Sequence, residues 1–364
     1  MGLHTVVGYY DSRADWLASP PPLHLDRTAL EELAFQIPRE TEVVRTMDEM
    51  RSVFGPLGIR CEMIAAGDRR LFELIERADE GTLFMNLTDG FFPVTTSYLP
   101  GLCAMMRRRY FGNSGALQLA VQNKYLQYAV CRLLSIRAPE TYLYDGDLCL
   151  GAEPPEDGRF EFFVKPFDQA NSIGIFNDAC CATVGEAAAL SLRIKQHYGT
   201  KALVQQRICG PTVRVNYVAV DPERPGEEAL GIHRMEGPPE PDRPFSTFEA
   251  HLEDFAAADS DYAAHAVAHC LTAGPEAAER LEVVAQIRSD VRKLVRQFGL
   301  RHFFSMDYRL GDDGQGYFIE INTLPFARNA ALRAHCRDMY GMTVGAALAH
   351  AMLASSDSAF PREW

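Results

Sequence analysis

A carboxylate and an amide interrupt an apolar stretch near the C-terminal end of the sequence, Gly-Tyr-Phe-Ile-Glu-Ile-Asn at residues 316–322. The alternation of a strand would put Phe318, Glu320 and Asn322 on one face. A charged side chain in such a strand is costly unless a partner offsets its desolvation. That partner can be a buried salt bridge, solvent at a sheet edge, or a metal ion.

The preceding stretch, residues 303–310, has the pattern of a second strand, and residues 311–315 have the composition of a hairpin turn. Pairing the two strands can bring Asp307, Glu320 and Asn322 together as three oxygen ligands. Two carboxylates and an amide suit Mg²⁺, which keeps several waters and accepts phosphate oxygens for the rest. A hairpin with surface carboxylates is the alternative interpretation.

A lysine and a small polar loop follow another apolar strand, at residues 163–176. Lys165 ends the strand, and the glycine-containing loop behind it can bring backbone N–H groups against phosphates while the lysine supplies a point charge. Lys124 lies in a helical stretch, residues 115–134. Either lysine, taken alone, is more often an ordinary surface residue.

Length and composition limit the class of protein. A chain of 364 residues is long enough for two or three packed units, and 47% apolar residues fit a globular protein. The 36 Lys and Arg stand against 49 Asp and Glu, a net charge of −13, which argues against broad nucleic-acid binding. Nine cysteines without a Cys-x-x-Cys pair argue against a disulfide framework. We recognise no signal peptide and no membrane-spanning run, so we expect a soluble cytoplasmic protein that binds neither nucleic acid nor membrane.

Short apolar strands alternate with helical patterns along the chain, which predicts an α/β fold. Besides the C-terminal hairpin, we expect strands at residues 4–10, 82–87, 160–166, 202–206 and 213–220, and helices at 115–134, 186–199 and 275–298. Their order predicts three α/β units with boundaries near residues 112 and 202.

Taken together and in this order, these segments resemble the ATP-grasp superfamily, specifically its D-alanine–D-alanine ligase-like branch. The segments that carry the resemblance are NLTDGF (86–91), YFGNSGALQLAVQNK (110–124), FVKPFDQANSIGI (163–175), ALVQQRICGPTVRV (202–215) and SMDYRL with GYFIEINTLP (305–310 and 316–325). The resemblance implies an ATP-grasp fold with ATP held between a central lid and a C-terminal domain. It divides the chain into an N-terminal domain (1–112), a lid (113–202) and a nucleotide- and metal-binding domain (203–364).

The resemblance also implies a role for each matching residue. Lys124 and Lys165 would hold ATP phosphates, under a flexible loop that contains Asn171 and Ser172. The remaining nucleotide contacts would come from Gln205, Gln206, Arg207, Ile208, Thr212 and Ile319. Asp307, Glu320 and Asn322 would bind two Mg²⁺ ions, with Mn²⁺ as a substitute and Glu320 bridging the pair. A substrate carboxylate would then take up the γ-phosphoryl group, and an amine would displace phosphate from the acyl phosphate.

Several residues depart from the family pattern on the substrate side. Ser305 stands where the family usually has an arginine, and Thr212 where it has a ribose-contacting glutamate. Arg328 is our first candidate for a substrate-carboxylate or oxyanion contact, with Arg214 and Arg234 as second choices. Asn322 is a further substrate candidate, and Ser305 and Arg309, on the strand face of Asp307, complete the catalytic candidates.

The retained ATP residues and the altered substrate residues predict an amino-acid ligase with small-molecule substrates, such as an L-amino acid or a γ-carboxylate in specialised biosynthesis. The alternatives are an authentic D-alanine–D-alanine ligase, an ATP-binding protein without turnover, and a kinase. A homodimer is the expected assembly.

Overall fold

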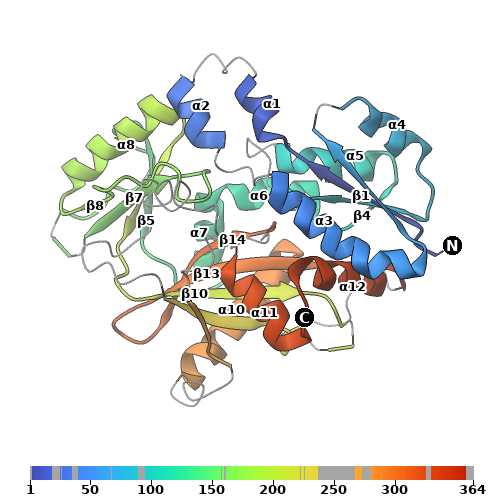
Figure 1. Cartoon of the computed structure of the whole chain (residues 1–364). Coiled ribbons are helices and arrows are strands. Elements are labelled where there is room, and N and C mark those ends of the chain that lie inside the picture. Colours follow the sequence, from blue (N-terminus) through green and yellow to red (C-terminus); the bar gives the residue numbers. More distant parts are fainter. Residues whose placement is uncertain are drawn as a thin grey trace.

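The computed structural model describes residues 2–18, 25, 27–34, 40–66, 68–88, 95–156, 158–159, 161–221, 223–224, 226–236, 267–272, 280–324 and 329–357. Three sheets form its framework, and each lies in a separate lobe (Figure 1). None of the helices within these ranges is both long enough and apolar enough to cross a membrane.

The first sheet is parallel, in the order β2-β1-β3-β4. Its strands are β1 (Thr5–Tyr10), β2 (Arg60–Ala65), β3 (Thr82–Asn86) and β4 (Arg109–Tyr110). The strands β1 and β3 are buried along almost their whole length, as expected where helices cover both faces of a parallel sheet. The helices of this part of the chain are α1 (Arg13–Ala18), α3 (Glu40–Phe54), α4 (Arg70–Arg77) and α5 (Tyr98–Met105), with short 3₁₀ turns at Gly55–Leu57 and Thr95–Ser97.

The second sheet is antiparallel, in the order β6-β5-β9-β7-β8. Its strands are β5 (Thr141–Asp145), β6 (Leu148–Cys149), β7 (Phe162–Pro166), β8 (Cys180–Cys181) and β9 (Ala202–Gln206). Helix α8 (Val184–Tyr198) packs on it; a capping box between Thr183 and Glu186 begins the helix, and Gly199 in a left-handed conformation ends it.

The third sheet is also antiparallel, in the order β12-β11-β10-β13-β14. Its strands are β10 (Thr212–Val218), β11 (Gly231–Glu236), β12 (Val267–Cys270), β13 (Phe303–Leu310) and β14 (Gly316–Asn322). One face packs against α6 (Gly115–Gln122), α7 (Lys124–Leu133) and α10 (Leu281–Phe298), whose apolar side chains share a core with Val213, Val215 and Met306.

The C-terminal helices α11 (Ala330–Tyr340) and α12 (Val344–Asp357) join the third sheet to the first lobe. Leu332 and Cys336 of α11 belong to the same core as Val218 of β10 and Val6 of β1. Helix α12 lies along α3, as Figure 1 shows. Helix α11 contacts β10, β11 and β12 of the third sheet.

The lobes do not follow the predicted boundaries. Residue 202 is the first residue of β9, which lies inside the second sheet, so the boundary at 202 would cut this sheet. Leu117 and Cys131, predicted to lie in the lid, pack in the core of the third sheet. Helix α2 (Arg27–Leu33), predicted to lie in the first unit, packs instead against the second sheet, beside α8 (Figure 1).

The structure has two helices, α6 and α7, where the sequence predicts a single helix at residues 115–134. Asn123 interrupts it, and the Asn123 side chain accepts a hydrogen bond of 2.8 Å from the Leu126 amide as the N-cap of α7. Lys124 is therefore the first residue of α7, and the start of this helix sets the position of its Cα atom.

Candidate active site

The two carboxylates of the C-terminal hairpin face each other across β13 and β14. Asp307 is the cross-strand partner of Glu320, and Ser305 that of Asn322. The register then shifts, because Tyr308 pairs with Phe318 and leaves Ile319 as the extra residue of a β-bulge.

Because of the bulge, Phe318 and Glu320 do not share a face of β14, although the predicted alternation places them on one face. Phe318 is 2% exposed and packs in the core of the third sheet, where its ring meets Tyr308 edge-on. Glu320 lies on the opposite face, in the row of Asp307. The extra residue at Ile319 thus lets one strand present a core phenylalanine on one face and, two positions later, a carboxylate on the other face.

Arg214 completes the row of Asp307 and Glu320, because β10 places it directly opposite Asp307. Its Nε donates to Asp307 Oδ1 at 2.6 Å and its Nη2 donates to Oδ2 at 2.8 Å. This is a bidentate guanidinium–carboxylate pair, the strongest geometry for such an interaction. The prediction that Arg214 belongs to the site is consistent with this position, although its partner here is a residue predicted to bind metal.

Two lysines reach the same place from other elements. The Lys124 Nζ at the start of α7 lies 3.5 Å from Glu320 Oε2 and donates to the Gln169 carbonyl at 2.7 Å. Lys165 comes from β7 of the second sheet and is 6% exposed. Burial lowers the pKa of Lys165 to about 8, and the neighbouring cations Lys124 and Arg309 add to this effect while Glu320 and Asp307 oppose it.

The same cations act on Glu320. Burial by itself would raise the pKa of Glu320, but the charges of Lys124, Lys165 and Arg214 outweigh burial and lower it. Glu320 is therefore held as a carboxylate that faces cations from three different elements. The site is a charge cluster between the second and third sheets.

The loop after β7, predicted to bind phosphates, contains three residues in a left-handed conformation. Asn171 and Ser172 both have positive φ angles, 52° and 59°, and Gly174 follows with a φ of 72°. Gly174 also approaches the ring of Pro166 so closely that an added Cβ would lie 2.4 Å from it. Lys124 is tied to this loop through its amide, which donates to the Phe167 carbonyl at 3.3 Å.

The predicted hinge residues lie at the end of β9. Gln205 is buried and donates to Thr141 Oγ1 at 2.8 Å, and the Gln206 amide donates to the Glu140 carbonyl at 2.7 Å. The Arg207 side chain forms an ion pair with Glu161. Ile208 follows without belonging to a strand, and Thr212 begins β10 as the cross-strand partner of Arg309.

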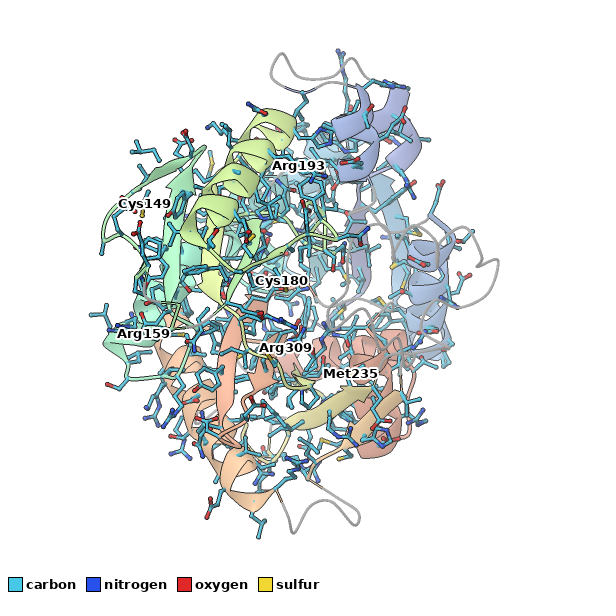
Figure 2. The ribbon with its side chains drawn as sticks, turned by 90° about the vertical axis from the view of Figure 1, so that its left-hand side faces the viewer. Cys149, Arg159, Cys180, Arg193, Met235 and Arg309 are labelled. Atoms are coloured by element: carbon cyan, nitrogen blue, oxygen red, sulfur yellow. The ribbon has the colours of Figure 1, made fainter. Side chains whose placement is uncertain are left out.

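The arginines are placed differently from one another. Arg309 Nη1 donates to the Gly210 carbonyl at 2.8 Å, and burial lowers the pKa of Arg309. Figure 2 shows Arg309 at the junction of the second and third sheets, below Cys180. Arg234 pairs with Val213, so the register puts it on the opposite face of the sheet from Asp307, where it contacts Glu236. The prediction for Arg234 is therefore wrong, and Arg328 lies outside the described residues.

The donor set fits a hydrated magnesium ion. Asp307 and Glu320 offer hard oxygens in one row, and Asn322 follows on the exposed end of β14, where its Oδ1 accepts from the Leu324 amide at 2.9 Å. Ser305, next to Asn322, is 2% exposed. Within the described ranges, no three His, Cys, Asp or Glu residues come together as metal ligands. Such a site suits Mg²⁺, which binds one or two carboxylates and takes its other ligands from water and phosphate.

Gln127 is a residue of the site that sequence reasoning missed. Strand β14 is at the edge of its sheet, so its outward amides need partners from outside the sheet. Gln127 of α7 accepts from the Ile321 amide at 2.7 Å, and the Arg137 carbonyl accepts from the Phe318 amide at 2.8 Å. The signal that was available is the spacing: Gln127 is one helical turn after Lys124.

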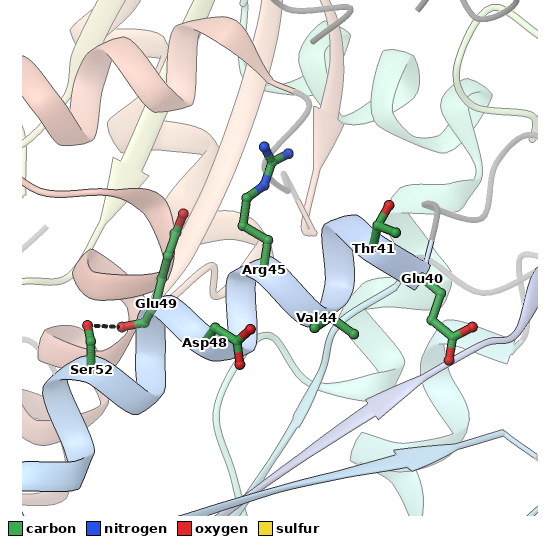
Figure 3. Close-up of a pocket in the computed structure, with 7 residues that line it drawn as sticks. All are labelled: Glu40, Thr41, Val44, Arg45, Asp48, Glu49 and Ser52. Atoms are coloured by element: carbon green, nitrogen blue, oxygen red, sulfur yellow. Dashed lines mark hydrogen bonds between the residues drawn. The ribbon is translucent and has the colours of Figure 1, made fainter. Parts of the chain in front are cut away.

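A shallow hollow elsewhere on the surface is formed by a single helix, α3. Its lining residues are Glu40, Thr41, Val44, Arg45, Asp48, Glu49 and Ser52, all shown in Figure 3. None of the predicted site residues lines this hollow, so it does not compete with the charge cluster as the candidate active site.

Several known proteins are similar to this chain in sequence or in fold. No protein-family model matches the chain. The chain is 25% identical over 230 residues to the vancomycin C-type resistance protein VanC1 of Enterococcus gallinarum, a match that covers 62% of this chain and 60% of that protein. It is 23% identical over 229 residues to the D-alanine–D-alanine ligase of Dechloromonas aromatica, covering 62% of this chain and 65% of the ligase. The sequence match thus spans less than two thirds of these curated relatives.

The structural likeness extends over almost the whole chain. The crystal structure of D-alanine–D-alanine ligase from Bacillus anthracis complexed with ATP superimposes with a TM-score of 0.65, covering 98% of both chains at 14% sequence identity. The chain has the ATP-grasp fold. In this chain, Lys124, Lys165, Asp307 and Glu320 converge between the second and third sheets.

Proposed function

We propose that this ATP-grasp protein is an ATP-dependent ligase that joins the carboxylate of one small molecule to the amine of another. One observation carries the proposal: two buried lysines, Lys124 of α7 and Lys165 of β7, face the two carboxylates of the C-terminal hairpin. Arg214 and Arg309 raise the number of cations around these two carboxylates to four, which is more than structural salt bridges would need. A loop of left-handed residues adjoins the cluster. A site for a metal-bound triphosphate needs all of these parts.

Each residue has a role in this reaction. Lys124 and Lys165 neutralise phosphate oxygens, and the loop with Asn171 and Ser172 offers backbone N–H groups and covers them. The buried end of β9, with Gln205 and the backbone after it, would border the adenine. The substrate carboxylate attacks the γ-phosphorus, ADP leaves, and the acyl phosphate that forms must be kept from water.

Asp307, Glu320 and Asn322 would hold the divalent cation, which neutralises the charge on the transferred phosphoryl group. The amine of the second substrate then attacks the acyl carbon, and inorganic phosphate leaves with formation of an amide bond. Arg309, partly exposed beside the cluster, is a candidate to steady the charge that develops on the acyl oxygen.

The substrates are amino acids or close relatives of amino acids. The relatives found by sequence include a D-alanine–D-alanine ligase, so D-alanine is one candidate substrate. Ser305 and Thr212, which differ from the family pattern, favour a different pair, such as an L-amino acid or a γ-carboxylate in specialised biosynthesis. Arg328 as a substrate contact, two metal ions, cytoplasmic location and a homodimer remain predictions.

The test is a ligation screen. The protein is incubated with Mg-ATP and pairs of amino acids, with D-alanine and L-amino acids in separate arms, and both ADP and product mass are measured. The account predicts amino-acid-dependent ADP release and a product whose mass is the sum of two substrates minus water. Glu320→Gln should lower the rate by ~100-fold or more, because it removes a charge that the transition state needs.

The matched control is Glu282→Gln, which makes the same change at an exposed position in the first turn of α10. Its rate should equal that of the wild type. ADP release with a phosphorylated but uncondensed product would identify a kinase instead. Nucleotide binding without any amino-acid-dependent ADP release would contradict the ligase function.

A further inference from the structure

Arg214 forms an ion pair with Asp307, the carboxylate that the proposed function assigns to a metal. Both oxygens of Asp307 accept hydrogen bonds from its guanidinium, at 2.6 Å and 2.8 Å. A divalent cation cannot use those lone pairs while the guanidinium holds them. The positive charge of Arg214 also repels a cation that approaches Asp307. In this structure, Arg214 therefore covers the Asp307 half of the proposed metal site.

The surroundings of Arg214 direct it to Asp307. On its other side in the cross-strand row stands His233, which is 1% exposed and supplies no carboxylate. Burial lowers the pKa of His233, so this neighbour is neutral near pH 7. Within the row, Asp307 and Glu320 carry the negative charge, and Lys124 already faces Glu320.

The charge balance of the cluster favours an anion over a free cation. Its described members are the cations Lys124, Lys165, Arg214 and Arg309 and the carboxylates Asp307 and Glu320. Cations exceed carboxylates, so a triphosphate is attracted to the site, whereas a bare divalent ion is not. A nucleotide that supplies phosphate oxygens gives these cations new partners and leaves the carboxylates for the metal.

We propose that Arg214 is a positioning residue that holds Asp307 until nucleotide arrives and then transfers its hydrogen bonds to a phosphoryl oxygen, so that nucleotide and divalent cation bind together. The inference rests on the proposed function, because it needs a triphosphate at this site. Arg214 thereby couples the two ligands, so that each raises the affinity of the other.

The coupling is measured with Mn²⁺ as the probe, by electron paramagnetic resonance of free Mn²⁺, with and without a non-hydrolysable ATP analogue. In the wild type, the analogue should raise the Mn²⁺ affinity strongly. Arg214→Gln removes the charge and the bidentate contact, so it should raise the affinity for Mn²⁺ alone by about tenfold and reduce the coupling by a similar factor. Arg214→Lys keeps a charge but only a point contact, and should give an intermediate affinity.

Arg234→Gln is the matched control, because Arg234 lies on the adjacent strand but on the opposite face of the sheet. It should leave both Mn²⁺ affinities unchanged. Circular dichroism and thermal unfolding check the fold of each variant, and if Arg214→Gln does not fold, Arg214→Lys decides: a Mn²⁺ affinity equal to that of the wild type overturns the inference.

The inference is also overturned if folded Arg214→Gln binds Mn²⁺ alone no more tightly than the wild type and keeps the full coupling. This outcome leaves the ligase function standing. The opposite outcome is also distinguishable. If the wild type shows the coupling and Arg214→Gln abolishes it, but the wild type forms no condensed product, the role of Arg214 holds and the ligase function is refuted.

Discussion

At the scale of single residues, the site is governed by burial and by the surplus of cations. Lys165 illustrates this, because it is 6% exposed and stands beside two other cations, Lys124 and Arg309. Together these effects lower the pKa of Lys165 to about 8, with burial as the larger cause. Binding of an anion beside Lys165 would therefore raise its pKa and keep it protonated.

This lowered pKa predicts a pH-dependent affinity for nucleotide. Below about pH 8 the free protein carries a charged Lys165, and the affinity should be at its full value. Above about pH 8 the free protein loses this proton, so binding must take it up again and the affinity should fall by up to tenfold per pH unit. Isothermal titration of a non-hydrolysable ATP analogue at pH 7 and pH 9.5 measures the loss, and the proton uptake is read from buffers of different ionisation enthalpy.

Lys165→Arg is the control, because arginine stays protonated throughout this range. Its nucleotide affinity should change much less between the two pH values. An equal fall in the wild type and in Lys165→Arg would show that another group, not Lys165, sets the pH dependence.

Which of these residues the sequence predicts depends on how local their roles are. Asp307, Glu320 and Lys165 stand in short segments whose pattern and resemblance suffice to single them out. The predicted place of Arg234 in the site differs from the structure, because the pairing of β11 with β10 decides which face of the sheet Arg234 occupies. The sequence of one strand does not show its pairing register with the next strand. The contact of Arg214 with Asp307 joins residues 93 positions apart, so it too depends on strand register.

At the scale of secondary-structure elements, α7 and β14 act as one unit. Lys124 and Gln127 lie on the same helix; the lysine faces Glu320, and the glutamine holds the next backbone amide of the strand, that of Ile321. Gln127 is 1% exposed, and its Nε2 donates to the Val121 carbonyl at 2.5 Å. It thus ties the start of α7 to the edge of the third sheet.

Replacing Gln127 tests this unit. Gln127→Leu leaves the buried Ile321 amide without its acceptor, which should lower the free energy of unfolding by about 1–3 kcal/mol. It should also weaken Mn²⁺ binding in the presence of nucleotide, because Glu320 is then less firmly held. Denaturant unfolding and Mn²⁺ titration measure the two effects.

Gln127→Glu separates the two hydrogen bonds, because a carboxylate still accepts from the Ile321 amide but no longer donates to Val121. It should retain Mn²⁺ binding better than Gln127→Leu does. If both variants bind Mn²⁺ like the wild type, Gln127 supports only the fold.

The bulge at Ile319 marks the limit of prediction at this scale. The period of two correctly identifies β14 as a strand but assigns Phe318 and Glu320 to the same face. The extra residue is accommodated by partners outside the strand, the Arg137 carbonyl and the Gln127 side chain. Both partners lie far from β14 in the sequence, and Gln127 is 194 positions from Ile321, so no window around the strand contains the information.

At the scale of the whole molecule, the three lobes are joined by segments from distant parts of the chain. Helix α2 packs on the second sheet, where Glu32 accepts hydrogen bonds from the Tyr198 hydroxyl at 2.5 Å and from His197 Nε2 at 2.9 Å. At the other end, α12 packs along α3 (Figure 1). Segments of the chain thereby connect the second and third sheets to the first lobe, although the charge cluster lies between the second and third sheets.

The order of segments predicts this overall architecture, whereas the crossing of α2 into the second lobe is not predicted. The ordered motifs determine which family fold the chain resembles, and the superposition with the Bacillus anthracis ligase agrees with that order. Helix α2 is a short segment of seven residues, and its apolar residues do not specify which lobe buries them.

The central claim is that a divalent cation binds between the carboxylates of Asp307 and Glu320, next to a triphosphate. The most direct test is a crystal structure with Mn²⁺ and a non-hydrolysable ATP analogue, in which anomalous scattering locates the metal. The account predicts a Mn²⁺ peak about 2.1 Å from oxygens of both residues, with phosphates in contact with Lys124 and Lys165. A bound nucleotide whose metal lies away from Asp307 and Glu320, with both carboxylates still held by Arg214 and Lys124, would contradict it.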